Sequence, residues 1–207
     1  MEKNTLMEKP ADIDHPIHDL LRRRWSPRAF SERMVEPEKL QSLFEAARWA
    51  PSSNNEQPWH FIVGTKDDLP AHDRFFHCLK EGNRKWAFRA PVLMLSVARL
   101  NFEDEDTPNR HAWHDTGMAV FSLTLQATAL GLIVHQMAGF DVEKARADLA
   151  IPPGFEPVAM IAVGYPGNPA ELPDYLRERE LKPRERKSVR EFVSSGMWNV
   201  PPAWIIK

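Results

Sequence analysis

The chain has 207 residues, of which 43% are hydrophobic and 27% are charged, and these proportions are typical of one globular domain. Its formal net charge of −2 excludes the strongly basic field on which most binding to nucleic acids and anionic membranes depends. The single cysteine, Cys78, excludes an internal disulfide and fits a reducing compartment.

The N-terminal residues are polar, and they contain acids and a proline where a secretory signal peptide would have an apolar core. We therefore expect a cytoplasmic protein. Its predicted organisation is a flexible N-terminal arm over residues 1–14, a main domain over residues 15–167, and a C-terminal extension over residues 168–207.

The first half of the chain contains three predicted helices and two predicted strands. Apolar residues at helical spacing predict the helices, and short apolar runs predict the strands. In chain order they are the helix Pro16–Arg23, the helix Val35–Ala50 with Pro37 near its start, the strand His60–Gly64, the helix Asp68–Lys80 ended by Glu81-Gly82-Asn83, and the strand Val92–Val97. The last of these is apolar throughout, as expected of a strand covered on both faces.

The second half continues with the helix His111–Gly131, the strand Ile133–Gly139, the helix Val142–Leu149 and the strand Pro157–Gly164. The stretch Met118–Val134 is apolar nearly all round, but polar residues interrupt it and it is short for a membrane span. It is expected to be buried in the domain core, at a subunit interface, or in both. Strands and helices do not alternate strictly and no glycine-rich nucleotide loop is present, which favours an α+β fold over a doubly wound one.

A polar loop over residues 50–59, APSSNNEQPW, separates the second helix from the first strand. Its prolines, serines and asparagines are typical of a turn, and its concentration of neutral amide and hydroxyl groups is suited to binding a polar ligand. A solvated connection between helix and strand is the alternative.

Two clusters of cations lie near the chain ends. One is in RRRWSPRAF, Arg22 to Phe30, and the other comprises Arg184, Arg186, Lys187 and Arg190. Each alone is commonly a solvated surface, but guanidinium groups also bind phosphate well. Together with the polar loop, they indicate a ligand with a phosphate at one end and a ring of carbonyls and nitrogens at the other. Flavin mononucleotide (FMN) has this pattern.

Other chemistries find less support. Ser52 and Ser53 lack the G-x-S-x-G context of a serine hydrolase. His111, His114 and Asp115 could share a helix face, but too few further ligands accompany them for a zinc site. We therefore expect neither a metal nor a catalytic side chain, and His135 is expected to be a core histidine.

The order of these motifs resembles the FMN-dependent nitroreductase family. RRRWSPRAF, APSSNNEQPWHFIV, GNRKWAFRAPVLML, ALGL, HQMAGF and PRERK carry the resemblance, which spans Asp19 to Glu191. It implies a central, mostly antiparallel sheet flanked by helices, in an intertwined homodimer with FMN sites at the interface. It also implies NADH or NADPH as donor and a small acceptor, such as a nitroaromatic or a quinone, in a ping-pong cycle.

The resemblance assigns the cofactor-binding residues. Arg24 and Ser26, with Trp25 between them, would lie at the ribityl phosphate, and Arg184 and Arg186 would complete the phosphate site. Arg28 and Asn83 would face the pyrimidine edge, and Met137, Ala138 and Gly139 would lie beside the ring with backbone N–H groups near N5 or O4. The polar loop would reach a flavin bound mainly by the other subunit, through Pro51, Ser52, Ser53 and Asn55, with Gln57 as a further candidate.

One departure from the family pattern stands at Trp86, where many members have a lysine, so that Arg28 is the only cation expected at the ring edge. The C-terminal GMWNVPPAW resembles segments that pack around the partner subunit, although simple docking of the tail explains it equally well. A reductive dehalogenase, an enoate reductase or a flavin-consuming enzyme of the same fold is an alternative that the segment Asn101–Arg110 would decide. A non-catalytic flavin-binding protein is another.

Overall fold

The structure is a computed structural model, and it describes residues 8–103 and 107–205. Residues 1–7 of the expected N-terminal arm and residues 104–106 of the segment Asn101–Arg110 lie outside the described residues.

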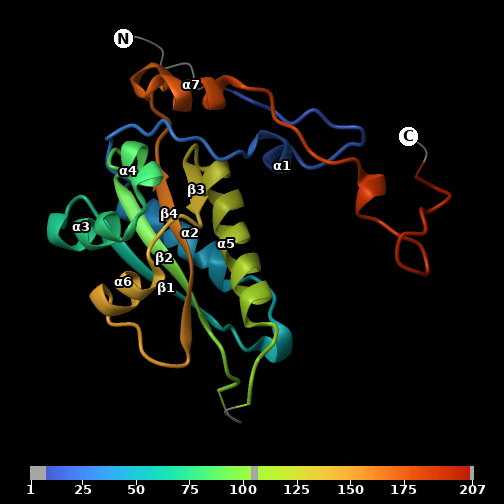
Figure 1. Ribbon diagram of the computed structural model, residues 1–207, viewed down its shortest axis with the longest axis horizontal. Helices are drawn as coiled ribbons and strands as arrows, with labels where there is room; N and C mark the ends of the chain where they lie inside the picture. The colour runs from blue at the N-terminus through green and yellow to red at the C-terminus, as the bar shows by residue number, and fades with distance from the viewer. Residues whose placement is uncertain (1–7, 104–106, 206–207) are drawn as a thin grey trace.

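One sheet of four strands forms the centre of the molecule (Figure 1). The strands are β1 (Trp59–Thr65), β2 (Val92–Arg99), β3 (Ile133–Met137) and β4 (Phe155–Gly164), in the spatial order β1-β2-β4-β3. Every neighbouring pair is antiparallel, with Ile62 opposite Leu95, Met94 opposite Ile161, and Val134 opposite Val163. The α+β class with an antiparallel sheet is therefore confirmed.

Helices cover both faces of the sheet, and two short helices lie at one end of it (Figure 1). One face carries α2 (Pro37–Arg48) and α5 (Ala112–Ala129), and the other carries α3 (Leu69–Cys78), α4 (Glu81–Ala87) and α6 (Val142–Asp148). At the end lie α1 (Asp19–Arg23) and α7 (Asp174–Leu181). Short 3-10 turns are η1 (Ser53–Asn55), η2 (Pro169–Glu171) and η3 (Val189–Glu191).

Strand β2 contributes to the hydrophobic cores on both faces. Leu93 and Leu95 belong to the core under α3 and α6, whereas Val92 and Met94 belong to the core under α2 and α5. Side chains alternate between the faces of a strand, so a strand covered on both sides must be apolar throughout. This confirms the prediction made from its sequence.

One predicted helix boundary is wrong, and one helix is missing from the prediction. Glu81-Gly82-Asn83 begins α4, and the break from α3 falls earlier, at Leu79 and Lys80, whose backbone is extended. Burial of Trp86 holds α4 against the core, which overrides the weak helix propensity of its first turn. Helix α7 was not predicted, because most of its residues are charged. Only two of its residues, Leu176 and Glu180, are buried, and they lie one helical turn apart.

Helix α5 is not buried on every side in this single chain. Trp113 and Phe121 are 49% and 44% exposed and lie on one stripe with the exposed Gly117. The helix ends in a Schellman motif in which Gly131 takes φ +73° and Leu132 N donates to Ala127 O at 2.8 Å. No helix in the described parts of the chain has both the length and the hydropathy needed to cross a membrane.

Candidate functional site

Three arginines from the two ends of the chain meet beside α1 and form the arginine cluster, Arg24, Arg184 and Arg186. Burial, and then repulsion from Arg186, lowers the pKa of Arg24. Burial, and then repulsion from Arg24 and Arg186, lowers the pKa of Arg184. Arg24 Nη1 also lies 3.5 Å from Ser26 Oγ. The residues predicted to bind the phosphate, from both ends of the chain, therefore lie together.

No carboxylate within residues 8–103 and 107–205 forms an ion pair with any member of the arginine cluster. Arg184 Nη1 donates to the carbonyls of Lys9 and Arg22 at 2.9 Å, and Arg186 donates to its neighbour Glu185 O. Like charges brought together and partly desolvated are unfavourable unless an anion binds among them. The cluster therefore fits a phosphate dianion.

Arg28 lies next to the cluster but is paired differently. Its Nη1 is 3.7 Å from Oε2 of Glu180, a residue of α7 that is 1% exposed. Nearby, His135 Nδ1 lies 2.9 Å from the carbonyl oxygen of Pro27. Burial, and then repulsion from Arg28, lowers the pKa of His135 to about 4, so that its imidazole is neutral at pH 7. His135 is a mostly buried histidine, as expected.

The turn after β3 is joined to α4 by two predicted site residues. Asn83 Nδ2 donates to Gly139 O at 2.9 Å, and the backbone N–H of Lys80 donates to the same carbonyl. A Cβ at position 139 would lie 2.7 Å from Asn83 Nδ2, so a larger residue there would displace the Asn83 amide from this bond. Met137 is 3% exposed, which leaves its backbone rather than its side chain for a ligand.

Trp86 lies in the core and not at a ligand surface. It is 1% exposed, stacks on Phe30 with ring centroids 6.0 Å apart, and lies 4.6 Å from the His135 ring. The position where many family members have a lysine is therefore used for packing.

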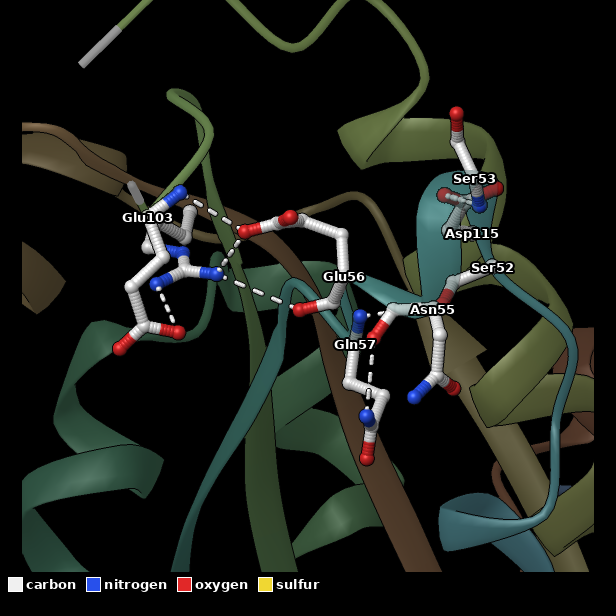
Figure 2. Close-up of polar contacts among 8 residues, drawn as sticks. Ser52, Ser53, Asn55, Glu56, Gln57, Glu103 and Asp115 are labelled. Carbon is white, nitrogen blue, oxygen red and sulfur yellow. Dashed lines mark hydrogen bonds and ion pairs between the residues drawn. The ribbon is translucent and has the colours of Figure 1, made fainter. Parts of the chain in front are cut away.

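The polar loop is held in an unusual backbone conformation (Figure 2). The backbone φ angles of Asn54, Asn55 and Gln57 are 53°, 58° and 49°. These values lie in the left-handed region, which residues other than glycine rarely adopt. Two hydrogen bonds inside the loop stabilise it, from Gln57 N to Ser52 Oγ at 3.0 Å and from Gln57 Nε2 to Asn55 O at 2.9 Å. The side-chain amides of Asn55 and Gln57 point to the same side, away from Asp115.

A buried aspartate and a half-buried arginine anchor this loop to the rest of the domain. Ser53 N donates to Oδ2 of Asp115, a 2% exposed residue in the first turn of α5, at 2.9 Å. Arg99 Nη2 donates to Glu56 Oε1 at 2.6 Å, and its Nη1 pairs with Glu103 at 2.9 Å (Figure 2). Such anchors are expected where several residues persist in a strained conformation.

The polar loop and the arginine cluster are at opposite ends of α5. Ser53 is bonded to Asp115 in the first turn of α5, whereas Arg24 lines a small pocket with Thr128 in the last turn. Asp115 and Thr128 are separated by roughly 20 Å along the helix axis, at 1.5 Å per residue. The structure thus brings together the predicted phosphate residues of the two chain ends, and it separately joins Asn83 to Gly139. Within one chain it holds the predicted loop residues at the other end of α5.

Sequence reasoning missed the residues that support the site. Asp115 has a weak signal, as an acid near the start of an otherwise apolar helix, but its neighbours His111 and His114 indicate a metal ligand and not a loop anchor. Glu180 and Arg99 had none, because each is one charge among many in its segment. Within the described residues, no group of three or more His, Cys, Asp or Glu side chains is arranged to hold a metal ion.

Comparison with known proteins gives consistent results. The family model described as "Nitroreductase family" matches residues 21–165. An uncharacterized 15.4 kDa protein of Mycolicibacterium smegmatis is 41% identical over 148 residues, which are 68% of this chain and 98% of that protein. A protein of Archaeoglobus fulgidus named "Putative NADH dehydrogenase/NAD(P)H nitroreductase" is 29% identical over 69% of this chain and 81% of its own length.

Solved structures have the same fold. One described as an oxidoreductase containing FMN superposes with a TM-score of 0.87 at 35% identity, covering 91% of this chain and 96% of its own. An FMN-dependent nitroreductase of Clostridium difficile superposes with a TM-score of 0.64 at 23% identity, covering 86% and 98% of the two chains, and this likeness concerns the fold alone.

Proposed function

The chain belongs to the nitroreductase family, and we propose that it is an NAD(P)H-dependent FMN oxidoreductase. The arginine cluster carries this proposal, because the guanidinium groups of Arg24 and Arg184 are partly desolvated and no member of the cluster has a carboxylate partner within the described residues. When bound, FMN supplies hydride and electron transfer between NADH or NADPH and a small oxidised acceptor, such as a nitroaromatic or a quinone, in a ping-pong cycle.

The protein's residues bind and orient the cofactor. The arginine cluster, with Ser26 and Trp25 beside it, holds the phosphate through charge-assisted hydrogen bonds. Arg28 and Asn83 would hold the pyrimidine edge, and the backbone of residues 137–139 would contact the ring. No side chain has to donate or remove a proton for hydride transfer, so we assign no catalytic residue.

We further propose that the site is shared between two chains in a homodimer. The polar loop, with Pro51, Ser52, Ser53, Asn55 and Gln57, lies roughly 20 Å along α5 from the residues around the arginine cluster. A two-fold axis that pairs the α5 helices in antiparallel fashion would bring the loop of one chain to the cluster of its partner.

Exposed apolar surface supports this dimer. Trp113 and Phe121 form an exposed stripe along α5. The C-terminal segment extends away from the sheet (Figure 1), and its Trp198 and Trp204 are 88% and 73% exposed. Apolar surface of this kind commonly marks an interface. Both stretches are available to pack against a second copy of the chain.

Titration with FMN and a matched ligand tests the proposal. The purified protein, stripped of flavin, should bind FMN in a calorimetric titration, and riboflavin, which lacks the phosphate, should bind at least tenfold more weakly. The loaded protein should lose its yellow colour when NADH or NADPH is added under argon and regain it with menadione or a nitrofuran. Failure to bind FMN would refute the proposal. Binding without bleaching would indicate a non-catalytic flavin protein.

A further inference from the structure

Glu180 is a buried carboxylate aimed at the proposed ring-edge arginine. It lies in α7, beyond residues 21–165 that the family model matches, and it is 1% exposed. Its Oε1 accepts hydrogen bonds from the backbone N–H groups of Arg28 at 2.7 Å and Ala29 at 3.2 Å. Its Oε2 has no hydrogen-bond partner within the described residues and lies 3.7 Å from Arg28 Nη1.

This arrangement holds Arg28 in position and offsets its positive charge. The two backbone bonds hold the segment that carries Arg28, and the carboxylate beside the guanidinium offsets its positive charge. A buried charge with an unpartnered oxygen is costly, and salt bridges of this kind seldom contribute much to stability. The cost therefore indicates a role in the site rather than in folding.

Among the described residues, Arg28 is the only cation within ion-pair distance of the Glu180 carboxylate. The side chain of Trp86 is in the core, and Lys85 is paired with Glu81 at 3.1 Å. His135 is neutral at pH 7, since burial lowers its pKa to about 4. Lys9 Nζ donates to the backbone carbonyl of Glu180, and burial lowers the pKa of Lys9 although the Glu180 charge acts to raise it.

We propose that Glu180 is a positioning residue that holds Arg28 at the flavin ring edge and, by offsetting its charge, lowers the reduction potential of the bound FMN. The inference rests on the proposed function. Two-electron reduction leaves negative charge at the pyrimidine edge, and a positive group there stabilises it. A guanidinium paired with a carboxylate stabilises that charge less than an unpaired one does.

Glu180→Gln separates charge from position, because a glutamine oxygen can still accept both backbone bonds. We expect the ratio of affinities for reduced and oxidised FMN to rise on the order of tenfold, as for removing one charge from a partly buried site. This corresponds to about 30 mV for a two-electron couple. Glu178→Gln, at an exposed position of the same helix, is the matched control and should leave the potential unchanged.

Amide exchange measures positioning without FMN. The N–H groups of Arg28 and Ala29 should stay protected within about threefold in Glu180→Gln, and they should lose protection on the order of tenfold in Glu180→Ala. Protection unchanged in Glu180→Ala would overturn the positioning role.

Three further outcomes decide the electrostatic role. A potential unchanged in Glu180→Gln, or shifted equally in Glu178→Gln, would overturn it. If Glu180→Gln does not fold, the double variant Glu180→Gln/Arg28→Gln replaces it. Because both charges of the pair are removed together, the affinity ratio should stay within about threefold of wild type, and a tenfold fall, as if Arg28 acted unopposed, would contradict the inference. A wild-type protein that binds no FMN would refute the proposed function itself, whereas a potential insensitive to Glu180 would refute this inference alone.

Discussion

Replacing Arg24 with glutamine should weaken FMN binding without weakening the fold. Arg24 is half-buried, and both burial and Arg186 lower its pKa, so the protein without an anion holds this charge at a cost. We expect FMN affinity to fall by about 1.5–3 kcal/mol, the value of a charge-assisted hydrogen bond, which is roughly 10- to 150-fold. The free energy of unfolding without FMN should stay constant or rise by about 0.5 kcal/mol, because a repulsion is removed.

Calorimetric titration and urea unfolding of the same preparations measure the two effects. The control is Arg23→Gln, one residue away, whose guanidinium is already paired with Asp19 at 2.7 Å on the surface. It should change FMN affinity less than about threefold, since exposed pairs are largely screened. FMN affinity unchanged in Arg24→Gln would refute the phosphate site. A loss of stability without FMN as large as the loss of affinity would show that Arg24 is structural.

Three other predictions address the loop, the buried histidine and the dimer. Asp115→Ala removes the acceptor of Ser53 N–H and should lower FMN affinity by about 1–3 kcal/mol in the same titration, whereas unchanged affinity would argue against the loop as part of the site. In the folded protein the pKa of His135 is lowered to about 4, so the unfolded chain takes up the proton first as pH falls. The contribution of the neutral ring to stability is therefore fully present above pH 6.5 and is lost progressively between pH 6.5 and pH 4. Between pH 7 and pH 5, wild type should therefore lose about 1.5–2 kcal/mol more stability than His135→Gln in urea unfolding, and equal losses would contradict the assignment. Phe121→Arg places a charge on the exposed stripe of α5 and should release both the dimer and the flavin on size exclusion, whereas a monomer fully loaded with FMN would refute the shared site.

The strands and the polar loop could be predicted because their signals are local. An apolar run such as β2 fits only a strand covered on both faces, and a loop with two prolines and several amides cannot continue a helix. Helix α7 could not be predicted, because its only apolar contact with the core is through Leu176 and its other buried side chain is a glutamate. The role of Glu180 could not be predicted either, because it depends on a contact with Arg28, which is far away in the sequence.

The site was predicted as a set of residues but not as an arrangement in space. Arg24 and Arg186 could be grouped from composition, because like charges separated in sequence indicate a common anion. Nothing local indicates that the polar loop is held at the far end of α5, since that depends on one bond from Ser53 to the buried Asp115. The family resemblance assigned the loop to a partner's flavin, and the length of α5 gives a physical reason for that assignment.

If the site is shared, flavin binding and dimerisation are linked through one helix. Each chain carries the arginine cluster at one end of α5 and the polar loop at the other, so a monomer holds two incomplete halves of different sites. A ligand that binds only the assembled site stabilises the dimer by mass action, and dimerisation raises its affinity in return. The exposed stripe on α5 is then the surface whose burial brings the two halves together, which explains why the helix is apolar on a face that its own domain leaves uncovered.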